Sequence, residues 1–360
     1  MTGRTCLRVL AAICVLASVC IAGCTANEGE PPSLEVLVVH SYHEGWDWNQ
    51  DVQDGIVEGL SREGYSEGED YELTTFYMDT KVTYTTTEAI EGRAALAVDL
   101  IQESNPDIVF VNDDNALKYV AVEYVESHPE SGLPFVFSGV NLDPTVYGPI
   151  ESLGAPGGTI TGALERFPYY EAFSLARTVC PEASSIVLLA DSSPSSDFVV
   201  GAFHERYLDV IADSPLDVIG PVQLDTFQGW QDAVSYYQEE AGFLGVMTYH
   251  QLRDEDGEIV DASEVVEWTT SHSTLPEMGF LTFHAEDGFL AACGASGYET
   301  GVYAGAVGGD ILNGADPGAI AIEDPGVIEV AVNLARADAL GITIPPEVLA
   351  DADVVFGAPE

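Results

Sequence analysis

The alternation of strand-like and helix-like segments constrains the fold of this chain more than any other sequence feature. Residues 107–111 read DIVFV, a continuous β-branched run typical of a strand buried on both faces. Helical periodicity separates the predicted strands, for example near 48–62, 88–103 and 115–127. Strands that alternate with helices of about 10–15 residues indicate parallel sheets covered on both faces, and therefore an α/β fold. The predicted strands are 35–41, 72–78, 107–111, 135–138, 159–163, 185–190, 218–223, 243–248 and 279–283.

The length of the chain points to more than one hydrophobic core. A single core rarely serves 360 residues, so we expect two domains or lobes. Glycine and proline cluster at Leu153–Gly158, between two runs of the strand–helix pattern, and mark the best boundary. The sequence therefore predicts two doubly wound parallel-sheet lobes.

The N-terminus has the pattern of an export signal. Arg4 and Arg8 precede the apolar run 9–22, which at about 14 residues is shorter than the ~20 that span a bilayer. The run ends in Ile-Ala-Gly-Cys, which resembles a lipobox, so we expect residues 1–23 to be a signal peptide and Cys24 to be lipidated. The alternative is cleavage nearby by ordinary signal peptidase, with Cys24 incidental. Residues 24–33 would form a flexible tether. This predicts an exported chain, lipid-anchored to the outer face of the cell membrane or in a periplasm.

The charge of the chain excludes one class of partner. Sixty Asp and Glu against 11 Lys and Arg give a formal net charge of −49, which repels phosphate backbones, so we expect no nucleic-acid binding. Only two lysines are present, Lys81 and Lys118. Such acidity suits a protein kept soluble in concentrated salt, because at about 1 M the Debye length is only ~3 Å. We interpret the charge as a halophilic trait, which concerns habitat and not function.

No pattern in the sequence indicates catalysis or metal binding. Nucleophile elbows, phosphate loops and glycine-rich dinucleotide turns are missing, so we expect neither an enzyme nor a cofactor. His40 lies in a strand and is interpreted as a core histidine. Asp113 and Asp114 could bind a cation or share a proton, but adjacent side chains point apart, so we expect one inward and one capping. Cys180 and Cys293 lack metal-ligand spacing; we favour free thiols, with a disulfide as the alternative.

Polar residues follow the predicted strands, where parallel sheets bind ligands. Each position has a second interpretation, because Ser, Asp and Asn are also preferred helix N-caps. Trp46 and Trp48, which flank an aspartate, could stack on an aromatic or cationic ligand or could pack the first helix. The strand-end segments are 41–43, 112–115, 138–141, 191–193 and 248–250.

Several of these stretches resemble one family of substrate-binding lipoproteins of ABC transporters. The resemblance covers essentially the whole mature chain and rests on VVHSYHEGWDWNQDVQDGIVEGL, FYMDTK at 76–81, PDIVFVNDDNALKYV at 106–120, FSGVN at 137–141 and the N-x-x-x-A-x-x-L-G-x-x-I-P-P ending. It implies a type I periplasmic-binding fold with two lobes joined by three hinge crossovers. The implied first lobe is 34–154 plus about 286–316, and the second is 158–284 plus about 317–360. In similar proteins the matching turns face the cleft, which here maps onto Ser41, Tyr42, Asp113, Asn115, Ser138 and Asn141.

The residues suggest how such a cleft would hold a zwitterion. A ligand carboxylate could bind hydroxyls and N–H groups after Ser41 and Ser138. A ligand ammonium could meet Asp113, Asp191 or Glu165, and an aromatic side chain could stack on Tyr42, Trp46 or Tyr249.

We therefore expect a monomeric extracytoplasmic solute-binding lipoprotein of an ABC importer. Its ligand would be a small amino-acid-like molecule, with an aromatic one as the narrower expectation, and its partners the permease and ATPase subunits. The alternative is a ligand-sensing receptor that partners a sensor kinase or chemoreceptor; a secreted hydrolase ranks third. No catalytic residue, metal or cofactor is expected.

Overall fold

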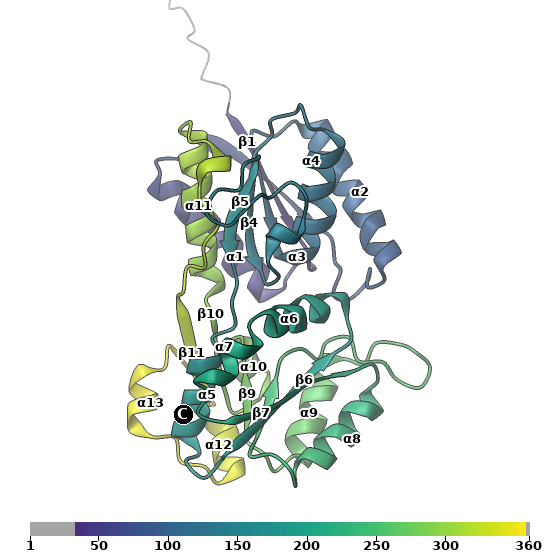
Figure 1. Ribbon diagram of the computed structural model, residues 1–360, viewed down its shortest axis with the longest axis vertical. Coiled ribbons are helices and arrows are strands. Elements are labelled where there is room, and N and C mark those ends of the chain that lie inside the picture. The colour runs from purple at the N-terminus through teal and green to yellow at the C-terminus, as the bar shows by residue number, and fades with distance from the viewer. Residues whose placement is uncertain (1–32, 358–360) are drawn as a thin grey trace, which may run out of the picture. The chain divides into compact units, whose positions relative to one another are not determined.

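The computed structural model describes residues 33–357, so the predicted signal peptide, Cys24 and nearly all of the tether lie outside the described residues. Two sheets organise the described chain, each with helices on both faces (Figure 1). We call each sheet with its helices a lobe. The first sheet has the strand order β2-β1-β3-β4-β5 and the second the order β12-β11-β10-β9-β8-β6-β7. All pairings are parallel except that of β10 with β11, so the α/β prediction is confirmed.

The first lobe is built from two separate parts of the chain. Its strands are β1 (Leu34–His40), β2 (Tyr71–Tyr77), β3 (Ile108–Asn112), β4 (Phe135–Val140) and β5 (Ile160–Leu164). Its helices are α1 (Asp47–Arg62), α2 (Thr87–Ser104), α3 (Asp113–Ala116), the π-helix η1 (Leu117–Val122), α4 (Glu123–Ser127), α11 (Gly297–Leu312) and the 3-10 turns η2 (Pro144–Val146) and η3 (Pro317–Ala319).

The second lobe takes up most of the remaining chain. Its strands are β6 (Ser185–Asp191), β7 (Asp217–Leu224), β8 (Phe243–Val246), β9 (Glu277–Gly279), β10 (Ala291–Ala295), β11 (Ile328–Asn333) and β12 (Val354–Phe356). Its helices are α5 (Tyr169–Val179), α6 (Pro194–Glu205), α7 (Tyr207–Ala212), α8 (Phe227–Tyr237), α9 (Ala262–His272), α10 (Phe283–Asp287), α12 (Leu334–Leu340) and α13 (Pro346–Asp351).

The alternation of side chains along β1 explains why helices cover both faces of the first sheet. Val36 and Val38 pack with α1 and α11, whereas Leu37 and Val39 pack on the opposite face with α2. Successive strand side chains point to opposite faces, so an unbroken apolar run needs a helical layer on each side.

Helices α1 and α11 touch through their backbones. A Cβ atom at Gly55 would overlap the carbonyl oxygen of Tyr298, and one at Gly301 would overlap that of Val52. The same relation holds one turn further on, between Gly59 and Gly305. We call these four glycines the glycine seam. It holds α11, from near the C-terminal end of the chain, tightly against a helix of the N-terminal half (Figure 1).

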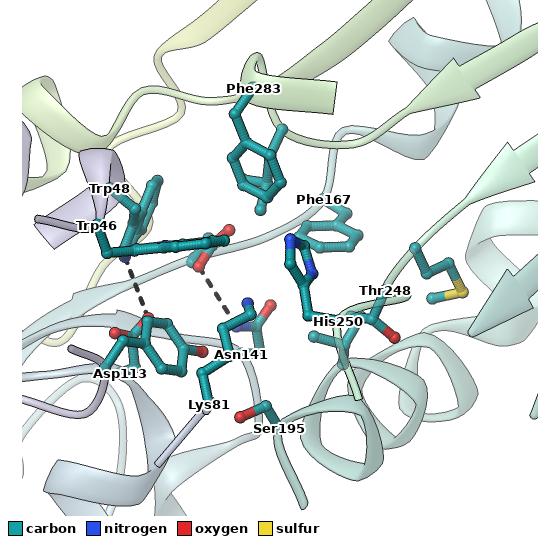
Figure 2. A pocket seen from close by; sticks show the side chains of 15 residues that line it. Trp46, Trp48, Lys81, Asp113, Asn141, Phe167, Ser195, Thr248, His250 and Phe283 are labelled. Carbon is teal, nitrogen blue, oxygen red and sulfur yellow. Dashed lines mark hydrogen bonds between the residues drawn. The ribbon is translucent and has the colours of Figure 1, made fainter. Parts of the chain in front are cut away.

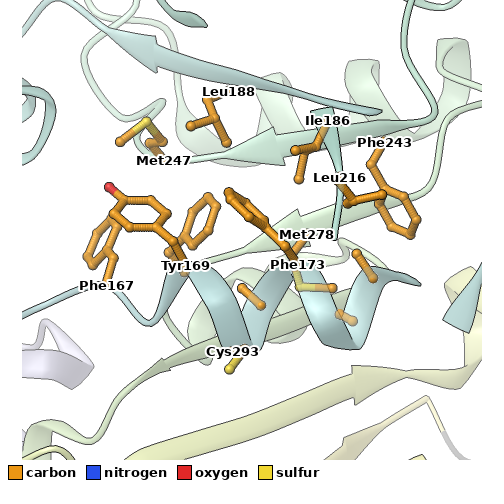
Figure 3. Packing of buried hydrophobic residues seen from close by; sticks show 14 of the residues in the cluster. Phe167, Tyr169, Phe173, Ile186, Leu188, Leu216, Phe243, Met247, Met278 and Cys293 are labelled. Atoms are coloured by element: carbon orange, nitrogen blue, oxygen red, sulfur yellow. The ribbon is translucent and has the colours of Figure 1, made fainter. Parts of the chain in front are cut away.

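An aromatic cluster forms the core on one face of the second sheet (Figure 3). Phe167, Tyr169 and Phe173 surround Phe280, with ring centroids 5.5, 5.2 and 6.2 Å from it. Met247 belongs to the same cluster. Because Phe167 and Met247 also line the pocket described below, the packed core of this lobe forms one wall of that pocket.

The chain passes between the two sheets three times. The passages lie at 165–168, between β5 and α5; at 296, between β10 and α11; and within 324–327, between η3 and β11. Strand β5 pairs with β4 in the first sheet and β10 with β9 and β11 in the second. The predicted boundaries, in contrast, put β5 in the second lobe and β10 in the first. The glycine and proline residues at Leu153–Gly158, which suggested the first boundary, belong to a loop that precedes β5. The exact lobe boundaries stay a prediction.

One predicted strand is misplaced. The prediction covers 279–283, whereas β9 ends at Gly279 and Phe283 already begins α10. The N–H groups of Phe280 and Leu281 both donate to Nδ1 of His284, each at 3.2 Å. A side chain that takes up backbone donors in this way competes with the strand ladder.

Two further features of residues 33–357 concern chemistry and membranes. Cys180 and Cys293 are free, with Cys293 buried and Cys180 partly exposed. Within this range no group of three or more His, Cys, Asp or Glu is placed to hold a metal ion. None of the helices in the same range combines the length and apolarity that a bilayer crossing requires.

Candidate ligand-binding site

A pocket lies where the carboxyl ends of the two sheets meet. In the first sheet the strand order reverses direction between β1 and β3, and in the second between β6 and β8. Ligands of open α/β sheets bind at such switch points. The pocket is narrow, with about 40 Å³ of free space. Figure 2 shows side chains that reach it from loops and helices of both lobes. The lining residues are Tyr42, Trp46, Trp48, Lys81, Asp113, Asn141, Glu165, Phe167, Ser195, Val199, Met247, Thr248, His250, Leu281 and Phe283.

Asp113 points into this pocket from the end of β3. Its backbone has φ of +70°, a left-handed conformation that is costly for a residue other than glycine and is concentrated at functional sites. The indole Nε1 of Trp48 donates to Oδ1 at 3.1 Å, whereas the buried Oδ2 has no hydrogen-bond partner. Burial raises the pKa of Asp113 well above its usual range, and the nearby Glu165 and Asp114 carboxyls raise it further.

Asp114 faces away from the ligand space and organises the neighbouring loop. Its carboxylate accepts the backbone N–H groups of Asn141 at 3.0 Å and Leu142 at 3.1 Å. Burial raises its pKa to about 6, which these hydrogen bonds partly oppose. The adjacent aspartates therefore point different ways as predicted, but Asp114 holds the turn after β4 instead of capping its own helix.

Glu165 is the second carboxyl group of the pocket. It begins the first passage between the lobes, and its N–H donates to the carbonyl of Val140 at 2.8 Å. Oε2 accepts from the Asn141 amide at 3.3 Å, while the buried Oε1 has no partner. Burial raises the pKa of Glu165 to about 8, with a further contribution from Asp114.

Lys81 brings a positive charge into the same pocket from the segment after β2. It is 9% exposed, and its Nζ lies 4.5 Å from the ring centroid of Tyr42 and 4.6 Å from that of Trp46. Across residues 33–357, no carboxylate oxygen comes within 4.0 Å of this Nζ. Burial lowers the pKa of Lys81, and the surrounding carboxylates, Asp191 foremost, act in the opposite direction.

Aromatic rings complete the pocket. Trp46 makes edge contacts with His43, His250 and Phe283, with centroids 5.3, 5.0 and 5.4 Å apart. His250 and Phe283 belong to the second lobe, so Trp46 meets both lobes (Figure 2). Burial, followed by the charge of Lys81, lowers the pKa of His250 well below its usual value, so its imidazole is neutral.

The structure brings Tyr42, Trp46, Asp113, Asn141 and Glu165 together in the pocket, as the sequence suggests. The other five predicted ligand-binding residues lie behind its wall. The Ser41 hydroxyl donates to the Asn112 carbonyl at 2.6 Å and accepts from the Ala116 N–H at 2.9 Å.

The remaining four also form hydrogen bonds to protein groups, although the buried Oδ1 of Asn115 has no partner. Ser138 donates to the Asn112 side chain at 3.3 Å, and Asn115 donates to Thr80 at 3.0 Å. Asp191 accepts from Ser193, Ser196 and Gln251, and the Tyr249 hydroxyl donates to Asp287. These polar groups hold neighbouring turns in place. This agrees with the second interpretation of strand-end residues, in which their side chains bind nearby protein groups and not a ligand.

Other pocket residues escaped sequence reasoning. Lys81 lies in the FYMDTK segment that supports the family resemblance, and His250 lies in a strand-end segment. Both positions therefore indicated the cleft, but neither residue was predicted to bind the ligand. Phe283 was assigned to a strand. Phe167 and Ser195 carry no local signal, because Phe167 lies in the passage after β5 and Ser195 in the first turn of α6, and only the fold brings them to the pocket. His40 is a core histidine as predicted, bonded to Gln53 and Asn112.

Comparison with known proteins identifies the family. The profile of the family described as ABC transporter substrate binding protein matches residues 43–356, and the chain belongs to this family. Its members bind the solutes of ABC transporters and act outside the cytoplasm. The chain is 22% identical over 283 residues to a tyrosine-binding protein of Clostridioides difficile strain R20291, covering 78% of this chain and 73% of that one.

Solved structures with the same architecture support the fold. A conserved domain protein of Vibrio cholerae aligns with a TM-score of 0.68 and 20% identity, covering 90% of this chain and 99% of that chain. An ABC domain from Streptococcus pneumonia in complex with L-Trp aligns with a TM-score of 0.67 and 20% identity, covering 90% of this chain and all of that one. The predicted type I periplasmic-binding fold is therefore confirmed.

Proposed function

We propose that this protein is the solute receptor of an ABC importer, exported and anchored through Cys24, and that it captures an amino acid between its two lobes. One observation carries the choice of ligand. Two buried carboxyl oxygens, Oδ2 of Asp113 and Oε1 of Glu165, lack partners inside a pocket walled by aromatic rings. Buried acceptors without donors are costly, so a ligand ammonium that supplies N–H groups would be bound strongly there.

The aromatic wall favours a flat side chain on that ligand. Trp46, Phe167 and Phe283 line the space next to the two carboxyl groups. A tyrosine-binding relative and a neighbour solved with L-Trp lend support, since both ligands combine an α-amino group with an aromatic ring. Aromatic ligands bind such rings by offset or edge-on stacking.

Ligand entry requires the lobes to part. Free space of about 40 Å³ is far below the several hundred Å³ that small-molecule sites usually offer. Gln251 of the second lobe donates to the Thr80 carbonyl of the first at 3.2 Å, so the lobes are in contact beside the pocket. Rotation about the three passages would admit the solute and then enclose it, and the closed form would be the one presented to the permease.

Native mass spectrometry and calorimetry test this function. Mature protein refolded from denaturant would be mixed with the twenty common amino acids, and we expect one intact aromatic amino acid bound per chain. Asp113→Asn should weaken that binding at least tenfold, whereas Asp256→Asn, in an exposed turn, should not change it. Retention of no amino acid would refute the ligand class, and chemical conversion of the pool would favour the hydrolase alternative.

A further inference from the structure

Lys81 is an unusual residue for this chain and for its position. The sequence has 60 acidic residues and only two lysines, yet one lysine is nine-tenths buried inside the pocket. Moving an ammonium group out of water is costly unless a counter-ion or hydrogen-bond acceptors replace the lost water. A buried lysine is therefore expected to have a partner.

No side chain or backbone group of residues 33–357 serves as that partner. The Nζ of Lys81 forms no hydrogen bond and no ion pair within this range, and only the rings of Tyr42 and Trp46 approach it. A cation–π contact leaves the three N–H donors of an ammonium group without acceptors. These donors face the same space as the unpartnered oxygens of Asp113 and Glu165.

The backbone next to Lys81 is held firmly, so the fold fixes the point from which the Lys81 side chain enters the pocket. The Thr80 N–H donates to the Ser41 carbonyl at 2.9 Å, and the Thr80 hydroxyl donates to the same oxygen at 2.7 Å. The Thr80 carbonyl accepts from Gln251 of the opposite lobe. Lys81 thus stands at the point where the lobes meet.

Three other groups near the pocket that could receive a ligand carboxylate are occupied. The hydroxyls of Ser41 and Ser138 are committed to Asn112. The nearby guanidinium group of Arg166 donates to the carbonyl oxygens of Asn141 and Glu165. Among the lining residues, Lys81 alone carries a positive charge.

These observations combine into one inference, which rests on the proposed function. We propose that Lys81 binds the α-carboxylate of the ligand while Asp113 and Glu165 bind its ammonium group, so that the pocket selects zwitterionic amino acids over the corresponding amines. A carboxylate that draws Nζ away from the rings of Tyr42 and Trp46 would also free their faces for the ligand side chain. An amine without a carboxylate would leave the Lys81 charge unpaired and would place a second cation beside it.

Isothermal titration calorimetry with three probes measures this selectivity. L-tryptophan, tryptamine and indole-3-propionate share one ring system and differ in the groups that Lys81 and the two carboxyls would bind. For the wild-type mature protein, freed of solute by refolding, we expect L-tryptophan to bind at least tenfold more tightly than either analogue. Equal binding of tryptamine and L-tryptophan would overturn the proposal without any variant.

Variants then assign the effect to Lys81. Lys81→Met keeps the length of the side chain and removes its charge, so L-tryptophan should lose at least tenfold in affinity while tryptamine keeps or gains affinity. Lys118→Met is the matched control, because the Lys118 Nζ also lies over a ring, 4.6 Å from the centroid of Tyr119, but does not line the pocket. We expect it to preserve the preference for L-tryptophan.

The outcomes separate this proposal from the proposed function. If L-tryptophan binds and Lys81→Met leaves both its affinity and its preference over tryptamine unchanged, Lys81 is not the carboxylate anchor but the receptor function stands. If the wild-type protein binds none of the three probes and no other amino acid, both proposals fall. Should Lys81→Met not fold, Lys81→Gln gives the same comparison with a neutral side chain that is polar.

Discussion

Glu165 is expected to lower the stability of the ligand-free protein at neutral and alkaline pH, and Glu165→Gln should reveal by how much. The carboxyl group is buried, its Oε1 has no partner, and burial raises its pKa from 4.5 to about 8. An acid whose pKa is higher in the folded state binds more protons when folded, so the free energy of unfolding falls as pH rises between the two pKa values.

The magnitude follows from the pKa of Glu165 in the folded and in the unfolded protein. A tenfold difference in the acid dissociation constant between these states corresponds to about 1.4 kcal/mol, so Glu165 would cost about 1 kcal/mol at pH 5 and about 5 kcal/mol at pH 9. Glutamine has the same shape and does not titrate. The gain in unfolding free energy from Glu165→Gln should therefore be about 4 kcal/mol larger at pH 9 than at pH 5.

Urea unfolding of the two proteins at pH 5, 6, 7, 8 and 9 measures this difference. A constant high salt concentration keeps the repulsion among surface carboxylates equally screened at every pH. Glu255→Gln, in an exposed loop, is the control and should leave stability within about 0.5 kcal/mol of the wild type at all pH values. Parallel curves for the wild type and Glu165→Gln would refute the assignment of the raised pKa to Glu165.

Two further predictions concern the lobes themselves. Gly301→Ala should destabilise the protein by more than about 3 kcal/mol in thermal or urea unfolding, because the added methyl group overlaps the α1 backbone. The control Gly92→Ala, in open space on α2, should raise the unfolding free energy by up to about 1 kcal/mol. Equal effects of the two substitutions would contradict the close backbone contact at the glycine seam. Arg336→Met should lower the unfolding free energy by about 3–5 kcal/mol at pH 7, because it leaves the buried carboxylate of Glu277 without its ion-pair partner. The loss should shrink in acid as Glu277 takes up a proton. A loss of unfolding free energy below about 1 kcal/mol at pH 7 would refute this prediction.

The sequence predicted the sheet architecture well because each β-branched run must be covered on both faces. Strand-end positions pointed to the edge of both sheets where the pocket lies, and five of the ten predicted ligand-binding residues line it. The predictions for Ser41, Ser138 and Asp191 placed these residues in the cleft, but their short side chains reach backbone and neighbouring polar groups first. The sequence alone does not distinguish a strand-end serine that binds a ligand from one that binds a neighbouring protein group.

The remaining site residues depend on how the lobes face each other. Phe167, Ser195 and Phe283 reach the pocket only because the two sheets present their carboxyl ends to one another. Lys81 was overlooked because a lone lysine after a strand usually lies in solvent. Its significance rests on burial and on the lack of a counter-ion, which are properties of three-dimensional packing.

The glycine seam has a consequence for how this chain can be divided. One face of the first sheet, including Val36, Val38 and Phe110, is covered jointly by α1 and by Ala304 and Val307 of α11. A fragment that ends before residue 297 would expose that apolar face, although it contains all five strands of the sheet. The first lobe is therefore not a separable N-terminal module. It reaches its native packing only after most of the second lobe has been synthesised, so truncation from the C-terminus would damage the half of the molecule furthest from it in sequence.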